Sequence, residues 1–102
     1  MPWINACATS DIEEEDVARF DHQGRTFAIY RSPDGDFFCT DGLCTHENVH
    51  LADGLVLDET IECPKHNGRF NYQTGEALRS PACDALGTYP TKIEDGRVWI
   101  EI

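Results

Sequence analysis

Basic residues and long apolar runs are both scarce in this sequence, and each shortage excludes a class of function. Eight Lys and Arg stand against nineteen Asp and Glu, so the formal net charge is -11 over 102 residues. Such a surface repels a phosphate backbone, and we therefore expect no nucleic-acid partner. No apolar run approaches the roughly 20 residues of a membrane-spanning helix, and residues 1–5 lack the basic and apolar segments of a secretory signal. We therefore expect a cytoplasmic protein with no membrane partner.

Cysteine is present, but in an odd number that excludes a complete set of disulfides. Five cysteines, which cannot all pair with one another, are typical of a protein in a reducing compartment. Cys39 lies in the strand-like run 36–40, where a thiol packs as a small hydrophobic side chain. We expect the same of Cys7 and Cys83, which leaves two cysteines for other chemistry.

Glycines punctuate the chain at regular intervals. Eight of them separate short segments that are rich in branched and aromatic residues. This spacing predicts an all-β fold of short antiparallel strands in a single domain, residues 1–102, with its strongest hairpin signal at 95–96. A capping-box pattern at Ser10 and Glu13 predicts one helical turn over 11–15. The expected strands are 3–7, 17–22, 26–31, 36–40, 55–57, 60–62, 69–71, 76–78, 86–94 and 98–102.

Side-chain alternation predicts the orientation of the strand over 26–31. Phe27 and Ile29 point to one face of this strand, and Ala28 and Tyr30 point to the other. All four are apolar or aromatic side chains.

Two short arms each carry one cysteine and one histidine. They are Cys44-Thr45-His46 and Cys63-Pro64-Lys65-His66, with sixteen residues between them. Two thiolates and two imidazoles can therefore converge on one inorganic centre. This set fits a Rieske [2Fe–2S] cluster, in which two His replace two Cys on one iron. The same four ligands could instead hold one tetrahedral Zn²⁺.

The charge of the ligands explains why a cluster would use this mixture. Two ferric ions, two sulfides and two thiolates sum to zero, whereas four thiolates leave the oxidised centre negative. Neutral imidazoles therefore make reduction easier and raise the potential to roughly -150 to +300 mV, from about -400 mV for plant-type centres. The electron gained also favours protonation of a histidine ligand, so electron and proton uptake should be coupled.

The paired motif resembles that of the Rieske proteins, and the resemblance covers nearly the whole chain. Chain length, acidity and the run Cys63-Pro64-Lys65-His66-Asn67-Gly68-Arg69-Phe70 are most similar to the small Rieske-type ferredoxins. These proteins serve bacterial aromatic-ring-hydroxylating dioxygenase systems. The resemblance implies one Rieske-type [2Fe–2S] cluster. It places Cys44 and Cys63 on the inner iron, and His46 and His66 on the outer iron near the surface.

The same resemblance implies a fold. We expect the Rieske fold, with an antiparallel β-sandwich base and a small cluster-binding subdomain over about 42–84. A proline-containing loop at 80–82 should cover the cluster from a third side.

Four positions depart from the respiratory Rieske proteins. Val49 and Lys65 stand where those proteins carry an extra pair of cysteines joined as a disulfide, and Gly68 and Phe70 stand where they place Ser and Tyr hydroxyls. Removing hydrogen-bond donors from a centre that gains negative charge makes reduction harder. We expect a potential at the low end of the Rieske range.

The resemblance implies an electron carrier with no substrate chemistry of its own. Such a protein takes one electron from a flavin-containing NAD(P)H reductase and passes it to a terminal oxygenase. One alternative is the small subunit of an NAD(P)H nitrite reductase or another oxidoreductase complex. A second alternative is a zinc-stabilised binding module.

Other histidines and the tryptophans carry weaker signals. His50 follows the first arm, but a spacing of four outside a helix has little meaning, and we do not expect it to bind metal. His22 is expected in an exposed turn. Trp3 and Trp99 are expected in the core rather than in an electron-transfer path.

Overall fold

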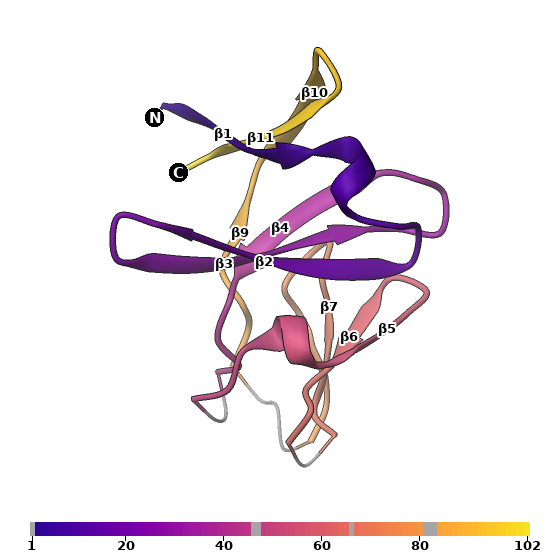
Figure 1. The fold of residues 1–102 in the computed structure, drawn as a ribbon. Coiled ribbons are helices and arrows are strands. Elements are labelled where there is room, and N and C mark those ends of the chain that lie inside the picture. The colour runs from indigo at the N-terminus through magenta and orange to yellow at the C-terminus, as the bar shows by residue number, and fades with distance from the viewer. Residues whose placement is uncertain (1, 46–47, 66, 81–83) are drawn as a thin grey trace.

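The computed structural model describes residues 2–45, 48–65, 67–80 and 84–102 (Figure 1). Over these residues the chain forms eleven β-strands and two short 3-10 helices. None of the helices in these ranges is long and apolar enough to cross a lipid bilayer. In chain order the elements are β1 (Trp3–Ala8), η1 (Thr9–Asp11), β2 (Asp16–His22), β3 (Arg25–Arg31), β4 (Phe37–Asp41), η2 (Leu51–Asp53), β5 (Leu55–Leu57), β6 (Thr60–Glu62), β7 (Arg69–Asn71), β8 (Ala77–Arg79), β9 (Thr88–Tyr89), β10 (Thr91–Glu94) and β11 (Arg97–Glu101).

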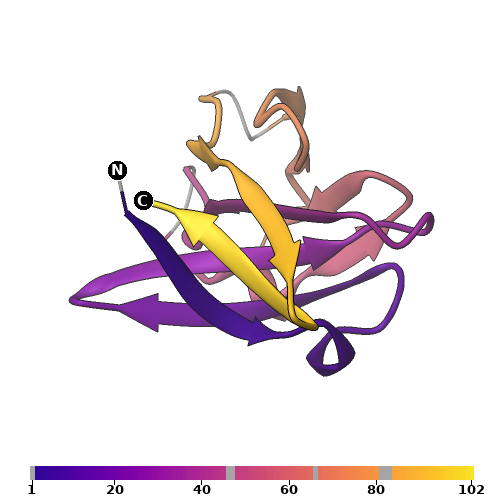
Figure 2. The same cartoon turned by 90° about the horizontal axis from the view of Figure 1, so that it is seen from above.

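These strands form three antiparallel sheets, which confirms the all-β prediction. Their strand orders are β1-β11-β10, β2-β3-β4-β9 and β5-β6-β7-β8. Figure 1 shows the first sheet at one end of the molecule, beside both chain termini, and the second sheet in the middle. The third sheet lies at the opposite end. Figure 2, which looks along this stack, shows the first sheet crossing over the second.

Strand β3 lies between two hydrophobic cores. Phe27 and Ile29 belong to the base core, which fills the space between the first two sheets. Ala28 and Tyr30 point the other way, into a second core that we call the site core. All four side chains are at most 1% exposed. The alternation predicted for this strand is therefore confirmed.

The two cores contain residues from distant parts of the chain. Burying each large side chain contributes about 1.5–3 kcal/mol, so these sets hold the sheets together. The base core comprises Ile12, Phe27, Ile29, Phe37, Cys39, Val98 and Ile100, and the site core comprises Ala28, Tyr30, Cys44, Leu51, Val56, Ile61, Cys63, Phe70, Tyr72 and Leu86.

Two local predictions were wrong. No helical turn forms over 11–15, because Ile12 is extended and only 2% exposed, with its side chain in the base core. The short helix η1 precedes it instead. The predicted strand over 86–94 is broken at Pro90, which has no amide hydrogen to donate. Strand β9, before Pro90, pairs with β4, whereas β10, after it, pairs with β11.

The aromatic side chains on the outer face of the first sheet also differ from expectation. Trp3 and Trp99 are half-buried, and the Lys92 ammonium lies over both rings, 4.6 Å and 5.9 Å from their centroids. The prediction that they belong to the core was wrong, since they cover a sheet face with Lys92 instead. His22 is likewise half-buried at the end of β2, where its ring stacks on Phe20 with centroids 6.0 Å apart.

Candidate metal centre

Cys44 and Cys63 begin two loops with the same closure. The amide of Cys44 donates to the carbonyl of Val49 at 3.0 Å, and the amide of Cys63 donates to the carbonyl of Gly68 at 2.6 Å. Each bond spans five residues. We call residues 44–49 the first Cys loop and residues 63–68 the second Cys loop. Figure 1 shows both emerging at the end of the molecule remote from the chain termini.

Both cysteines are buried in one core. Cys44 is 6% exposed and Cys63 is 1% exposed, and both belong to the site core with Phe70 and Tyr72. The structure thus brings the two predicted cysteine ligands to the same side of the protein. The two predicted histidine ligands, His46 and His66, lie outside the described residues.

A threonine in the first arm connects it to the chain that follows the expected covering loop. The Thr45 hydroxyl donates to the carbonyl of Asp84 at 2.8 Å, across 39 residues of sequence. Pro81 and Ala82 of the loop predicted at 80–82 lie outside the described residues. The Thr45 bond was not foreseen, because no local pattern links positions so far apart.

The third sheet supports the second Cys loop. Val56, Ile61, Phe70 and Ala77 stand opposite one another across its four strands, and the first three are buried. Three expected strands of this sheet, over 55–57, 60–62 and 69–71, match the structure to the residue. The sheet therefore positions the second Cys loop between β6 and β7.

An ion pair joins the two ends of this loop on the outer face of the sheet. Glu62 precedes Cys63, and its carboxylate accepts from the Arg69 guanidinium at 2.8 Å. Both side chains are partly exposed, so the pair stabilises the loop by no more than about 1 kcal/mol.

His50 directly follows the first Cys loop and pairs with the residue that directly precedes it. It forms a β-bridge with Leu43, and its ring accepts from the amide of Ala52 through Nδ1 at 3.0 Å. The other ring nitrogen, Nε2, lies 2.8 Å from the Thr26 hydroxyl. Both nitrogens are therefore engaged within the protein, in agreement with the expectation that His50 is no metal ligand. Burial, followed by the charge of Arg19, lowers the pKa of His50.

The other described cysteines lie elsewhere. Cys39 is in the base core, where burial raises its pKa to about 12. Burial, followed by the charge of Asp11, also raises the pKa of Cys7. Neither thiol is disposed to ionise, which is what metal binding requires.

The paired Cys loops supply a donor set that fits the two-cysteine half of a Rieske site, with one histidine position in each loop for the other half. In the described part of the chain, no group of three His, Cys, Asp or Glu is placed to hold a metal ion.

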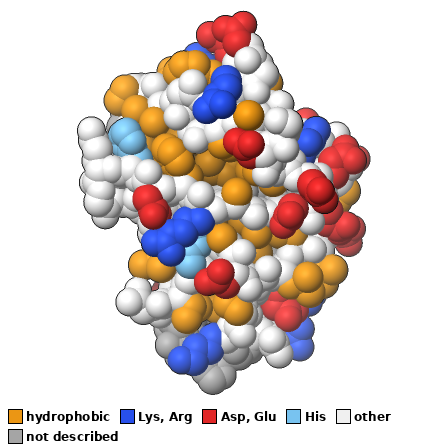
Figure 3. Space-filling view, in the orientation of Figure 1, with side chains coloured by type: hydrophobic (Ala, Val, Ile, Leu, Met, Phe, Trp, Pro, Cys, Tyr) orange, Lys and Arg blue, Asp and Glu red, His pale blue; other side chains and the backbone are white. Residues whose placement is uncertain are grey.

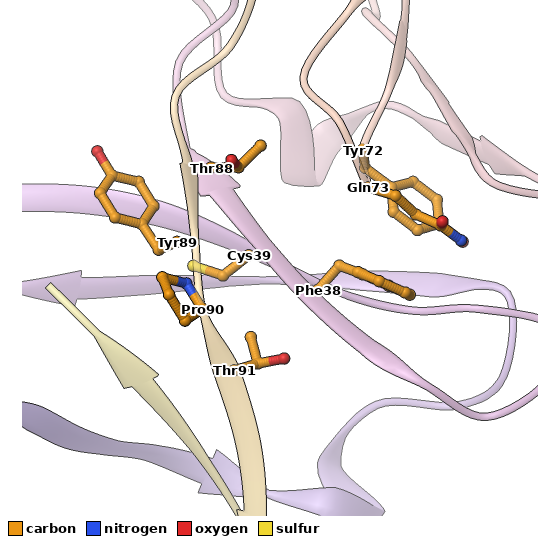
Figure 4. Close-up of a pocket in the computed structure, with 8 residues that line it drawn as sticks. All are labelled: Phe38, Cys39, Tyr72, Gln73, Thr88, Tyr89, Pro90 and Thr91. Carbon is orange, nitrogen blue, oxygen red and sulfur yellow. The ribbon is translucent and has the colours of Figure 1, made fainter.

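A groove of about 500 Å³ opens beside strand β4 (Figure 4). Figure 4 shows Tyr72 and Gln73 on one side of it and the β9–β10 segment on the other, with Phe38 and Cys39 between them. The Tyr72 ring stacks on Tyr30 with centroids 4.5 Å apart. Burial, followed by nearby carboxylates, raises the pKa of Tyr72 to about 12, as burial does for Cys39. Burial, followed by Asp41, also raises the pKa of Tyr89, the third titratable side chain of the groove. All three groups therefore stay protonated at neutral pH, which does not suit a general base.

A family model described as the Rieske [2Fe-2S] domain matches residues 2–90. The ferredoxin component of the naphthalene 1,2-dioxygenase system of Pseudomonas putida is 44% identical over 102 residues, which is 100% of this chain and 97% of that protein. Similarity to this relative therefore extends over the whole chain and includes the segments of both Cys loops.

Two solved structures have the same fold. The ferredoxin of Sphingomonas yanoikuyae B1 superimposes with a TM-score of 0.92 at 35% identity, covering 99% of each chain. A chain from the complex of reduced oxygenase and oxidised ferredoxin in carbazole 1,9a-dioxygenase superimposes with a TM-score of 0.90 at 34% identity, covering 96% of this chain and 91% of that one. These similarities agree with the sheet arrangement described above.

Proposed function

This chain belongs to the family of Rieske [2Fe–2S] domain proteins, and we propose that it carries single electrons between two proteins of an aromatic-ring dioxygenase system. Its donor is a flavin-containing NAD(P)H ferredoxin reductase, and its acceptor is a terminal Rieske non-haem iron oxygenase. The match to a ferredoxin component over 100% of this chain and 97% of that protein carries this proposal. A ferredoxin solved together with its oxygenase has the same fold, which supports the choice of acceptor.

The proposed site consists of Cys44, His46, Cys63 and His66, one pair from each Cys loop. When bound, a Rieske-type [2Fe–2S] cluster supplies one reversible one-electron step. The two loops hold the cysteines in the site core, away from water, and the histidines are proposed to form the route by which electrons leave. We take residues 42–84 as the cluster-binding part of a single domain over 1–102. A carrier of this kind transforms no substrate itself.

We also propose that the protein works in the cytoplasm. Its odd number of cysteines suits a reducing compartment, and Cys7, Cys39 and Cys44 are not joined in disulfides.

Visible and EPR spectra of the purified protein test the identity of the centre. We expect a red-brown protein that bleaches on addition of dithionite and then gives a rhombic EPR signal, with an average g below the free-electron value. A colourless, EPR-silent protein with stoichiometric zinc would contradict the proposal and indicate a zinc-stabilised module. Purification from its native host tests the role: a large subunit that co-purifies tightly would indicate a subunit of another oxidoreductase.

The midpoint potential is expected at the low end of the Rieske range, nearer to about -150 mV than to +300 mV. The physical reason is the loss of hydroxyl donors, because Gly68 and Phe70 provide none. A redox titration followed by visible absorbance measures this value. A strongly positive midpoint would contradict the argument and would not suit electron uptake from a flavin reductase.

A further inference from the structure

His50 is a buried imidazole whose hydrogen bonds define a single protonation state. It is 5% exposed, so each ring nitrogen needs a partner within the protein. The Thr26 hydroxyl donates its one proton to the Asp21 carboxylate at 2.6 Å. Thr26 must therefore accept from the ring, and Nε2 of His50 carries the proton.

The other ring nitrogen leads to the same assignment. Nδ1 accepts from the amide of Ala52 at 3.0 Å, so it has no proton of its own. Two separate bonds thus require the same neutral tautomer of His50. Hydrogen bonds run in one direction from Ala52 through His50 and Thr26 to Asp21, and bonds in such a chain strengthen one another. The lowered pKa of His50 agrees with a neutral ring, since burial and then Arg19 favour the neutral form, whereas Asp21 and Asp53 oppose it.

The backbone around His50 connects the first Cys loop to the β2–β3 hairpin. Gly42 donates to the carbonyl of Thr26 at 3.0 Å, and Leu51 donates to the carbonyl of Gly42 at 2.8 Å. A Cβ atom on Gly42 would lie 2.5 Å from Nε2 of His50 and 3.0 Å from the backbone of Thr26. Only glycine allows this approach. Gly42, which precedes the first Cys loop, is thus packed directly against the ring of His50, which follows that loop.

We propose that His50 is a positioning residue for the redox centre, because it ties the first Cys loop to the base of the protein through Thr26. The proposal rests on the proposed function in one respect only, the identity of the centre that the first Cys loop binds. The bond from the Cys44 amide to the Val49 carbonyl is adjacent to the β-bridge between Leu43 and His50. In the second Cys loop the Cys63 amide makes the corresponding bond, but that loop is held by the third sheet.

This difference between the loops provides an internal control. A residue that acts only on overall stability would affect both loops, whereas a positioning residue of the first loop would affect one. Thr26→Val removes the partner of Nε2 at nearly constant volume, and Thr26→Ser retains the hydroxyl. Asn in His50→Asn can still accept from the Ala52 amide but is too short to reach Thr26. Thr91→Val is a matched control, since it removes a comparable bond of 2.7 Å to the carbonyl of Phe37 in the base.

The experiment is hydrogen–deuterium exchange on the full-length, metal-loaded protein, read by mass spectrometry on peptides that cover 43–52 and 60–70. We expect Thr26→Val and His50→Asn to speed exchange in 43–52 by about tenfold or more, because a buried partner loses its hydrogen bond. Exchange in 60–70 should stay unchanged. Iron transfer to a chelator, followed by the loss of visible absorbance, should accelerate in parallel by about tenfold or more.

Thr26→Ser and Thr91→Val should behave as the unaltered protein in both measurements. Equal acceleration in both peptides, or none in 43–52, would overturn the proposal. The exchange comparison does not depend on which metal the protein holds. A protein that proves to contain zinc would contradict the proposed function while still deciding the role of His50.

Discussion

Replacing Cys44 or Cys63 by alanine is expected to leave the purified protein without iron, whereas replacing Cys39 by alanine should leave its iron content unchanged. All three side chains are buried, with 6%, 1% and 2% of their surfaces exposed. Removal of any of them therefore leaves a small cavity in a core. Only the first two thiols stand at the start of a Cys loop, where a thiolate would bind an inner iron. The pKa of Cys39, raised to about 12 by burial, makes its thiol a poor ligand.

Iron per chain, measured together with the visible spectrum, checks this prediction. Cys39→Ala serves as the control for loss of packing, because its thermal stability should fall about as much as that of Cys63→Ala before metal loading. Iron retained by Cys44→Ala or Cys63→Ala would show that the ligands lie elsewhere. Iron lost from Cys39→Ala alone would assign the site to the base core.

The parts of this structure that could be predicted from the sequence depend on local patterns. Strand β3 alternates between two cores because consecutive side chains of a strand point to opposite faces, and both faces here are apolar. Strands β5, β6 and β7 lie between turn signals only a few residues apart. Each Cys-His arm is contained in four residues or fewer, so the candidate ligands are visible without knowledge of the fold. Assignment of all four ligands remains a prediction.

The parts that could not be predicted depend on residues distant in sequence. Thr26 and His50 are 24 positions apart, and no local pattern connects them. A histidine near a metal motif is readily taken as a candidate ligand, whereas the structure shows that both of its nitrogens are used. The break at Pro90 and the burial of Ile12 are also tertiary effects, since each depends on the sheet that a segment joins. The sequence did contain a signal for the break at Pro90, because proline lacks the amide hydrogen that a continuous strand would need there.

Several acidic side chains lie along one edge of the face shown in Figure 3. Figure 3 shows them along the edge where the β3–β4 and β5–β6 turns lie. Burial and then the charges of Glu59, Glu15, Asp58 and Asp34 raise the pKa of Tyr72, so all four carboxylates lie near that side chain. The carboxylate of Glu15, in the segment between η1 and β2, also accepts from the Asp58 amide at 2.8 Å, which joins that segment to the β5–β6 turn. Such a distribution produces a field that acts on a partner before contact.

Electron transfer between this protein and its reductase or oxygenase should therefore slow steeply as salt rises. Steering by a charge of -11 toward basic docking faces would raise the association rate by about tenfold or more at low salt. Screening shortens the range of the field to about 10 Å at 0.1 M ionic strength and about 3 Å at 1 M. Stopped-flow measurement of the second-order rate constant over this range provides the test. A rate constant that does not change with salt would contradict steering.

A pair of matched variants separates long-range steering from direct contact. Glu13 and Glu14 are exposed, and within the described ranges neither side chain makes a hydrogen bond or an ion pair. The double substitution Glu13→Gln and Glu14→Gln should lower the rate constant at low salt and leave it unchanged at 1 M, because it removes two charges and no structural bond. Glu13→Asp with Glu14→Asp keeps both charges and should match the unaltered protein at every salt concentration. A decrease that persists at 1 M would instead show that these side chains touch the partner, since screening does not abolish a contact.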